Sequence, residues 1–424
     1  MQVLESAREL EVIGEYDLIV CGGGPAGVSA AIAAGRLGVD TLLLEATSSL
    51  GGIWTSGLVP FVWDSDSKTG LVGELKERLT DLQGYPPRKR GSGYLFDPEA
   101  MKVLLDELCL EAKVDVLFNT RVVGVVQERD KLTGVITEGP SGREVFVGHL
   151  FADCTGNGDL AAFAGCRYDV GHPETGQLQP ASLTALVTGV PEHMSETRTS
   201  ADKDAFCQLL RSVGVEPSYQ KATLARTPYP GLWTLGVNHE YGVRHDSAKN
   251  ITVATMRARR EVFNAVKRLR TLPGWEKFHL VATSSQLGLR EGRRVCGLYT
   301  VSVDDLINGR RWDDGICLVR FCVDLHVLEF RKGEGAVSEG IRVKPYHIPY
   351  RSLVSCDIGN LAMAGRCISG DFYAHASYRV TGNAVPMGEA VGIAAHMALE
   401  ADSDFAHVDG RRVAERMRDR GHIL

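Results

Sequence analysis

The sequence predicts an α/β protein whose first domain is a Rossmann-type dinucleotide-binding fold, and three observations carry this prediction. Residues 18–21 form an apolar run of the length expected for a buried parallel strand. Gly22, Gly24 and Gly27 follow in the spacing G-x-G-x-x-G and open a helix of small residues. Glu45 ends the next apolar run, about 20 residues after the glycines.

Each residue of this motif has its own physical reason. Gly22 permits the turn out of the strand, Gly24 lets the backbone approach a pyrophosphate, and Gly27 lets the helix lie close to the sheet. The N-terminus of the helix presents free N–H groups and a partial positive charge to phosphates. Glu45 is expected to hold ribose hydroxyls. Strand, turn, helix and acidic residue in this order predict dinucleotide binding.

Length and net charge limit the classes of protein to which the chain can belong. With 424 residues the chain is too long for one compact core, so two domains are expected. A net charge of −6 argues against a nucleic-acid partner. No N-terminal segment has the form of a secretion signal. The uncharged stretch 18–35 contains the glycine cluster, which favours strand–turn–helix over a membrane span. We expect a cytoplasmic protein without a membrane partner.

Cysteine and histidine positions give no metal site. The ten cysteines are scattered without C-x-x-C spacing, which excludes a zinc ribbon, a thioredoxin-like dithiol and a four-cysteine cluster. We expect most of them to be buried reduced thiols. His172, His239 and His245 lie in loops without metal-ligand spacing and are expected at the surface.

The first 165 residues continue the predicted domain. The pair Gly51-Gly52, just past the second strand, suits a cofactor longer than one nucleotide, because the backbone must approach it again; an ordinary glycine loop is the alternative. Helical and strand patterns then alternate. Helices are expected at 71–82 and 98–112, a strand at 114–118, an antiparallel meander at 121–128, 132–138 and 144–147, and a further strand from 150 into a glycine turn.

The pattern changes near residue 166 and returns to the first type near residue 346. The middle segment lacks a second G-x-G-x-x-G and mixes strand and helix patterns, so we expect a substrate domain at 166–345. The first domain is expected to be discontinuous, with residues 1–165 joined by 346–424. Its last helix carries a small-residue face that can pack on protein or on a flat ring.

Further motifs add a family resemblance. They are Gly51-Gly52-x-x-Thr55, Asp153-Cys-Thr-Gly-Asn-Gly-Asp159, Arg290-Glu-x-x-Arg294, Ala364-Gly-Arg and His375-Ala-Ser-Tyr-Arg379. With the first motif they resemble the FAD-dependent oxidoreductases of the glutathione-reductase-like superfamily, whose members include flavoproteins related to heterodisulfide reductase. The resemblance implies FAD rather than NAD. It also implies a Rossmann-type FAD-binding domain of three-layer ββα architecture with an inserted α+β substrate domain.

The resemblance also implies where FAD lies. Val122 is expected near the adenine, Gly365 near the ribityl–phosphate chain, and the start of the last helix near the flavin ring. The residues expected to bind the cofactor are Gly22, Gly24, Pro25, Ala26, Gly27, Glu45, Gly51, Gly52, Thr55, Val122, Thr155, Gly156, Gly365, Asn383, Ala384 and Gly388.

Four residues are candidates for the chemistry. His375 precedes the last helix, and the pKa of histidine suits proton transfer near neutrality, although a structural role is the alternative. Arg379 is expected to anchor a carboxylate or to oppose charge on the flavin; an internal salt bridge is the alternative. Tyr373 is a weaker candidate, since aromatic residues near a flavin often only pack. Arg290 is expected in a polar wall or in a buried ion pair.

Three functions stay open from the sequence. The first is a flavoenzyme that transfers hydride between a small or medium organic substrate and flavin N5. The second is a flavin-bearing electron-transfer subunit with a redox partner protein. The third is an NAD(P)H-using flavin reductase or monooxygenase, which the missing second nucleotide motif disfavours. A homo-oligomer also stays open.

Overall fold

The computed structural model describes residues 3, 7 and 9–424, and its main sheet confirms the predicted α/β class. The strands of this sheet are β1 (Val12–Cys21), β2 (Thr41–Leu44), β6 (Asp115–Leu117), β7 (Arg121–Glu128), β8 (Lys131–Gly139), β9 (Gly142–Asp153) and β20 (Leu361–Met363). Their order is β6-β2-β1-β9-β8-β7, with β20 paired to β9. The pairs of β1 with β2 and β9, of β2 with β6, and of β20 with β9 are parallel. The carboxyl ends of these strands therefore meet at one edge of the sheet.

The predicted meander is present as β7, β8 and β9, but β9 is longer than expected. The strands predicted at 144–147 and from 150 onward are one continuous strand, because β9 pairs antiparallel with β8 in its first half and parallel with β1 from Val145 to Asp153. β1 begins at Val12 for the same reason, since its first residues pair with β9. A partner strand thus extends both elements beyond their apolar runs.

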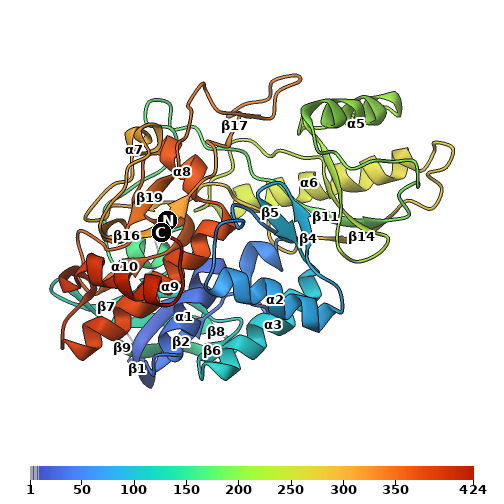
Figure 1. Ribbon diagram of the computed structural model, residues 1–424. Helices are drawn as coiled ribbons and strands as arrows, with labels where there is room; N and C mark the ends of the chain where they lie inside the picture. Colours follow the sequence, from blue (N-terminus) through green and yellow to red (C-terminus); the bar gives the residue numbers. More distant parts are fainter. Residues whose placement is uncertain (1–2, 4–6, 8) are drawn as a thin grey trace.

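Helices α1 (Pro25–Gly35), α2 (Leu71–Gln83), α3 (Pro98–Glu111) and α9 (Thr381–Glu400) pack together beside the sheet (Figure 1). Although α1 and α9 are separated by more than 300 residues in sequence, they lie in direct contact. Both are rich in Ala and Gly, which lets two helix backbones approach closely. A helix near the C-terminal end of the chain thus packs on the helix that follows the glycine turn, and the discontinuous first domain stays a prediction.

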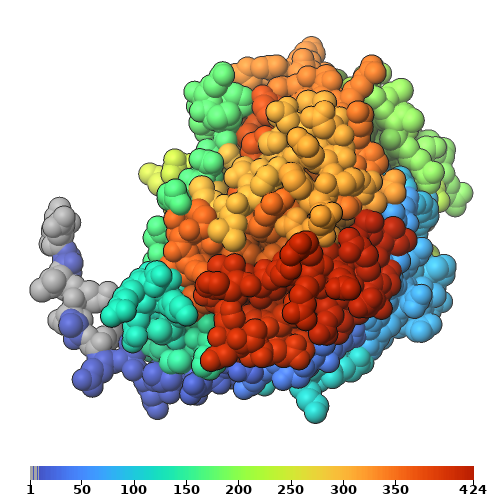
Figure 2. Space-filling view, turned by 60° about the vertical axis from the view of Figure 1, so that its left-hand side comes forward, coloured from blue at the N-terminus to red at the C-terminus, as the bar shows by residue number. Residues whose placement is uncertain are grey.

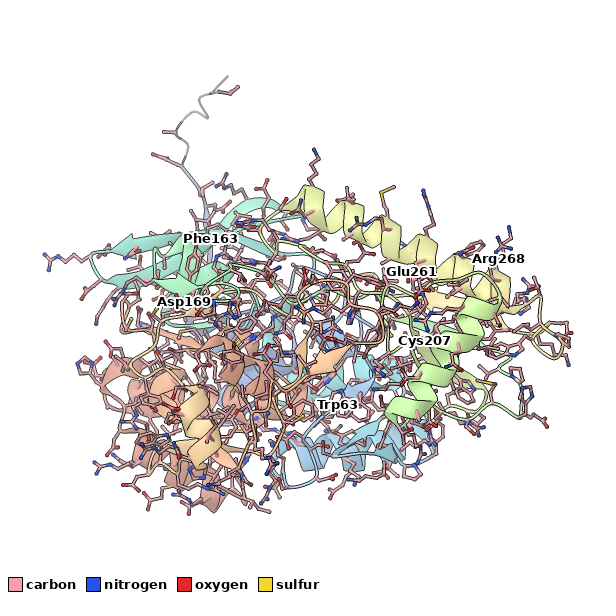
Figure 3. All side chains as sticks on the ribbon, turned by 90° about the horizontal axis from the view of Figure 1, so that it is seen from above. Trp63, Phe163, Asp169, Cys207, Glu261 and Arg268 are labelled. Carbon is pink, nitrogen blue, oxygen red and sulfur yellow. The ribbon has the colours of Figure 1, made fainter. Side chains whose placement is uncertain are left out.

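A second, antiparallel sheet has its own helices. Its order is β12-β13-β11-β14, and α5 (Ser200–Ser212) and α6 (Ala248–Leu269) lie beside it (Figure 1). Seen from above, α5 with Cys207 and α6 with Glu261 lie together at one end of the molecule (Figure 3). The strands are β11 (Ala185–Thr188), β12 (Thr223–Arg226), β13 (Leu232–Gly236) and β14 (His279–Thr283).

The buried apolar side chains form two clusters. The smaller one contains only residues from Ala181 to Leu287 and belongs to the second sheet. Side chains such as Val295, Ile316 and Ile348 belong to the larger cluster, which also contains the core of the main sheet. The predicted division at 166–345 therefore stays a prediction, and this packing favours a narrower second domain.

The remaining elements connect the two sheets or cover the first one. In Figure 2 the C-terminal segment forms a continuous red surface beside the orange segment near residue 310. Within the described residues, no helix is both long and apolar enough to cross a membrane. The elements outside the two sheets and their helices are β3 (Phe61–Val62), β4 (Arg88–Arg90), β5 (Gly93–Leu95), α4 (Asp159–Phe163), β10 (Tyr168–Asp169), β15 (Arg294–Val295), α7 (Val303–Asn308), β16 (Gly315–Val319), β17 (Leu325–His326), β18 (Ala336–Val337), β19 (Tyr346–Pro349), α8 (Phe372–Tyr378), α10 (Gly410–Asp419) and four short 3₁₀ turns, Gly52–Trp54, Tyr350–Ser352, Gly365–Cys367 and Phe405–His407.

Candidate functional site

The three glycines after β1 have different surroundings. Gly22 has φ +101°, and a Cβ atom added to it would lie 2.5 Å from the carbonyl oxygen of Cys154. A Cβ added to Gly27 would lie 1.8 Å from the carbonyl oxygen of Gly22. A Cβ added to Gly24 would meet no atom within 4 Å. Packing therefore requires Gly22 and Gly27, whereas Gly24 alone faces open space.

The second glycine pair borders the same open space. The N–H of Gly51 donates to the carbonyl oxygen of Gly23 at 2.8 Å, and a Cβ added to Gly52 would lie 3.1 Å from Cα of Gly24. No side chain caps the N-terminus of α1, which begins with Pro25. The free N–H groups of that helix end thus face a gap that Gly24 and Gly52 border, and this fits a pyrophosphate group.

Glu45 holds the glycine loop in place. Its side chain is 6% exposed, and Oε2 accepts from the N–H of Gly23 at 2.7 Å. Oε1 accepts from the N–H and hydroxyl of Thr47 at 2.7 and 2.8 Å. The carbonyl oxygen of Glu45 accepts from the N–H of Thr120, two residues before Val122, at 3.0 Å. Glu45 and Val122, both expected at the adenosine end of the cofactor, therefore lie close together.

Three chain segments meet at the other end of the glycine loop. Gly365, just after β20, has φ +87°; an added Cβ would lie 3.1 Å from Cβ of Ala26 and 3.8 Å from Cβ of Ala384. Asn383, at the start of α9, is fully buried, and its Nδ2 has no hydrogen-bond partner among the described residues. A buried amide without a partner is consistent with a polar ligand at this place.

Three expected residues hold loops within the protein. Thr155 donates to Oδ1 of Asp153 through its N–H and hydroxyl, at 3.0 and 2.7 Å. Thr55 donates its hydroxyl proton to the carbonyl oxygen of Leu50 at 2.5 Å. The carbonyl oxygen of Gly156 accepts from Nε of Arg366 at 2.8 Å. These bonds shape the loops around the site, and direct contact with the cofactor stays a prediction for these residues.

Gly388 lies where α9 packs on α1, and its contact with FAD stays a prediction. A Cβ added to it would lie 2.1 Å from the carbonyl oxygen of Ala26, and one at Gly392 would lie 2.5 Å from that of Ala30. The small-residue face of α9 therefore packs on α1 and not on a flat ring. The N–H of Ala384 donates to the carbonyl oxygen of Val380 at 3.3 Å. That amide is therefore engaged within the helix.

A polar group of four residues, here called the arginine cluster, joins the two sheets. It consists of Arg290, Arg379, Asp324 and Gln179. Nη2 of Arg379 lies 2.7 Å from the carbonyl oxygen and 3.3 Å from Oδ2 of Asp324, and 3.3 Å from Oε1 of Gln179. Arg379 therefore has the internal ion pair that the sequence left as its alternative role.

Arg290, unlike Arg379, forms no ion pair with a described carboxylate. Its Nη1 donates to the carbonyl oxygen of Pro180 at 2.5 Å and to the hydroxyl of Ser182 at 2.9 Å, and both acceptors are neutral. Desolvation and the nearby Arg379 lower the pKa of Arg290 to about 10, although the side chain is partly accessible. A group that is both accessible and desolvated lies on an inward-facing surface rather than on the outer one.

The segment that carries Arg290 lies against the cofactor loops. The N–H of Ser285 donates to the carbonyl oxygen of Ser56 at 3.0 Å. A Cβ added to Gly288 would lie 3.3 Å from Cδ1 of Ile53, directly after Gly52. Nη1 of Arg366, directly after Gly365, donates to the carbonyl oxygen of Leu289 at 2.5 Å. The arginine cluster is therefore next to the glycine loops.

Comparison with known proteins identifies the chemistry of this site. A family model described as FAD dependent oxidoreductase matches residues 17–417. The chain belongs to the FAD-dependent oxidoreductase family. It is an enzyme, and its cofactor is FAD. The glycine loops with their open space fit this cofactor. Kinship with heterodisulfide-reductase flavoproteins stays a prediction.

Similar proteins include enzymes of several kinds. Digeranylgeranylglycerophospholipid reductase 1 of Methanococcoides burtonii is 32% identical over 135 residues, covering 28% of this chain and 33% of that protein. Nicotine dehydrogenase of Pseudomonas putida is 39% identical over 84 residues, covering 16% and 17%. This chain thus matches a third or less of the length of these relatives.

A solved structure shows the same fold. The geranylgeranyl bacteriochlorophyll reductase-like protein of Thermoplasma acidophilum matches 96% of this chain and 84% of its own length with a TM-score of 0.51. The sequence identity is 14%, so this similarity concerns the fold alone.

The proton-transfer role of His375 stays a prediction, and the structure shows the surroundings of this side chain. The side chain is fully buried in α8, and neither ring nitrogen forms a well-aligned hydrogen bond with a described residue. Desolvation and the charges of Arg294, Arg379 and Arg366 hold the pKa of His375 well below its usual value. The imidazole is therefore neutral near pH 7. Tyr373 contacts His172 at 3.5 Å and not the arginine cluster.

We expect the buried His375 to make stability depend on pH. Its folded-state pKa is lowered, so below its usual value of 6.5 the unfolded chain binds more protons than the folded one. Stability is then full above pH 6.5 and falls as pH decreases, by up to about 1.4 kcal/mol per pH unit. Urea unfolding at pH 7 and pH 5 should show a smaller loss for His375→Leu than for the unaltered protein. Equal losses would contradict this prediction.

Several residues of the site carry no signal in the sequence. Gln179, Asp324 and His326 carry no motif, and they meet only because the second sheet is folded against the first domain. His239 and His245 were expected at the surface, but they are 2% and 9% exposed. That expectation was wrong because the loops that carry them pack between the sheets. In the described part of the chain, no three His, Cys, Asp or Glu residues are grouped to hold a metal ion.

Proposed function

We propose that this enzyme transfers hydride between FAD and a small or medium organic substrate that carries a carboxylate or another anionic group. One observation carries the proposal: Arg290 is an inward-facing cation that forms no ion pair within the described residues. A desolvated cation without a partner is unfavourable, and an anionic ligand at this position would remove the penalty. The relatives match only in part, so their substrates are not transferred.

Different residues of the chain would bind the anionic group, hold the cluster in position and exchange the proton. Arg290 would bind the anionic group through the N–H donors that Pro180 and Ser182 leave free. Arg379 is largely neutralised by Asp324, and Gln179 fixes its position. FAD, when bound, supplies the two-electron acceptor or donor. Asp324, as the carboxylate of the cluster, would exchange the accompanying proton.

A panel of substrates tests this proposal. Small 2-hydroxy and 2-amino carboxylates, each paired with its neutral amide, are mixed anaerobically with the holoenzyme, and bleaching of the flavin absorbance is followed. We expect bleaching by at least one acid and much slower bleaching by its amide. Equal bleaching by acid and amide would contradict the anionic substrate. Bleaching by NADH or NADPH alone would favour the reductase alternative, and bleaching by a protein alone would favour the electron-transfer alternative.

Arg290→Met should weaken substrate binding specifically. Methionine keeps much of the buried length but removes the charge, and charge-assisted hydrogen bonds are worth about 1.5–3 kcal/mol, so KM should rise about 10- to 100-fold. Stopped-flow flavin reduction against acid concentration measures the change. Arg244→Met is the control, since Arg244 pairs with Asp246 and is not in the arginine cluster. An unchanged KM in Arg290→Met would contradict the proposal that Arg290 binds the anionic group of the substrate.

A homo-oligomer, a redox partner protein and a cytoplasmic location stay predictions.

A further inference from the structure

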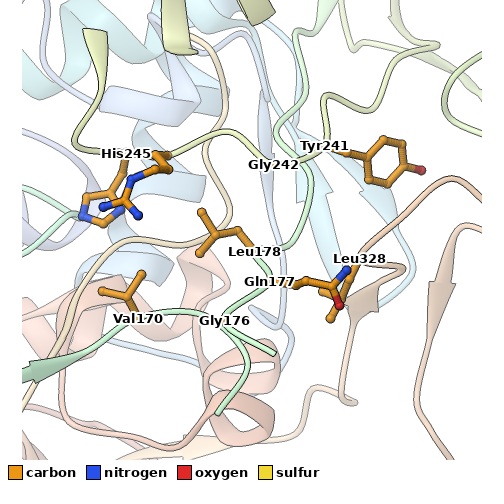
Figure 4. Close-up of a pocket in the computed structure, with 9 residues that line it drawn as sticks. Val170, Gly176, Gln177, Leu178, Tyr241, Gly242, His245 and Leu328 are labelled. Atoms are coloured by element: carbon orange, nitrogen blue, oxygen red, sulfur yellow. The ribbon is translucent and has the colours of Figure 1, made fainter. Parts of the chain in front are cut away.

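A cavity of about 470 Å³ lies between the segment 170–178 and the loop 241–245. Its walls include Leu178, Leu328 and Tyr241. Figure 4 shows Tyr241 and His245 on opposite sides of the view, with Leu178 between them. Tyr241 and Arg244, which line the cavity, are partly or fully exposed, so water can reach it.

A line of titratable side chains leads from this cavity to the arginine cluster. The hydroxyl of Tyr241 lies 3.5 Å from Nδ1 of His239. Nε2 of His239 lies 3.1 Å from Nδ1 of His326. Nε2 of His326 lies 3.4 Å from Oδ2 of Asp324. Each imidazole uses one ring nitrogen for each of its two neighbours, so the line is continuous from Tyr241 to Asp324.

The protonation states of the two histidines and of Asp324 allow one consistent direction of hydrogen bonding along the line. Desolvation, with the charge of Arg290, lowers the pKa of His326 to about 4 and that of His239 well below its usual value, so both rings are neutral near pH 7. Burial alone would raise the pKa of Asp324, but His326 and Arg379 outweigh it and keep the carboxylate ionised. Each ring then has one N–H donor and one acceptor.

With these states, donors and acceptors match along the whole line. Tyr241 donates to His239, His239 donates to His326, and His326 donates to the carboxylate of Asp324. Transfer of one proton along each link moves one proton from the cavity to Asp324. The opposite transfer uses the other tautomer of both rings. The remaining charged or titratable groups that face Asp324 are Arg290, Arg379, Lys203, Tyr219 and Cys322.

The two histidines in the middle of the line are buried, whereas Tyr241 and Asp324 at its ends are partly exposed. His239 is 2% exposed and His326 is 7% exposed. The ring of Tyr219 stacks on His239 with centroids 4.0 Å apart. Two imidazoles in an interior position are costly compared with apolar side chains, and packing alone gives no reason for them.

We propose that Tyr241, His239, His326 and Asp324 form a proton-transfer path that connects the FAD-side arginine cluster with the cavity. The path rests on the proposed function, in which hydride transfer at FAD must be balanced by a proton. The bonds that change are the O–H of Tyr241, one N–H of each imidazole and the O–H of Asp324. The path itself neither gains nor loses electrons.

The test needs no organic substrate. Photoreduced holoenzyme in weakly buffered phenol red is mixed anaerobically with ferrocenium. Two ferrocenium ions take two electrons from the cofactor, and one proton is released to water. Flavin absorbance reports electron loss, and the dye reports proton arrival. In the unaltered protein the two signals should coincide. In His239→Gln the dye should lag by about 10²-fold, because the amide keeps hydrogen bonds but does not relay a proton.

Two further variants keep the test decisive. Tyr241→Phe breaks only the outermost link and should produce the same kind of lag, even if His239→Gln folds poorly. His245→Gln is the control, since His245 lines the same cavity outside the path. Dye signals that coincide with flavin signals in both path variants would overturn the path, as would an equal lag in the control. A failed substrate panel, by contrast, would overturn only the anionic substrate.

Discussion

A Gly24→Val variant is expected to fold normally and to contain no FAD. Gly24 has φ −72° and ψ −176°, which valine adopts without strain and which suits the residue before Pro25. A Cβ atom there would meet no protein atom within 4 Å, so the side chain would enter only the open space at the N-terminus of α1. The pyrophosphate would lose that space, and visible absorbance of the purified protein should disappear.

Gly73→Val is the matched control for this variant. A Cβ at Gly73 also meets no atom within 4 Å, but this glycine lies in α2, away from the glycine loops. It should keep full flavin absorbance at a similar yield. Retained yellow colour in well-folded Gly24→Val would mean that the pyrophosphate does not lie at this turn.

Gly388→Leu is expected to lower the free energy of unfolding by at least about 3 kcal/mol. A Cβ at Gly388 would lie 2.1 Å from a backbone oxygen of α1, 2.9 Å from the nitrogen of Ala30 and 2.9 Å from Cβ of Ser29. Backbone atoms do not yield as a flexible side chain does, so α9 must move away from α1. Urea unfolding followed by circular dichroism measures the loss.

The same variant separates two roles of Gly388. If the glycine serves the contact of α9 with α1, apoprotein and holoprotein should both lose stability. If it serves the flavin ring, as the sequence predicted, Gly388→Leu would lose FAD while the apoprotein kept its stability. Gly73→Leu is the control for placing leucine in a helix.

Local stretches of sequence determined the cofactor half of this protein. β1, the glycine turn, α1 and Glu45 are contiguous or nearly so, and their spacing is set by the geometry of one strand–turn–helix unit. The positive φ of Gly22 and the close approach at Gly27 are local requirements that favour glycine, so they are visible in the sequence. For this reason dinucleotide binding could be predicted from the printed residues, whereas FAD rather than NAD was implied by the family resemblance.

Only the tertiary structure decided the arginine cluster and the line of histidines. Gln179, His239, Arg290, Asp324 and Arg379 lie dozens of residues apart, and no spacing rule connects side chains that separate loops and a helix end bring together. Tertiary packing also buried His375, paired Arg379 with Asp324 and turned the small-residue face of α9 toward α1. Burial and charge pairing depend on which surfaces meet, and that is a property of long-range packing rather than of any short segment.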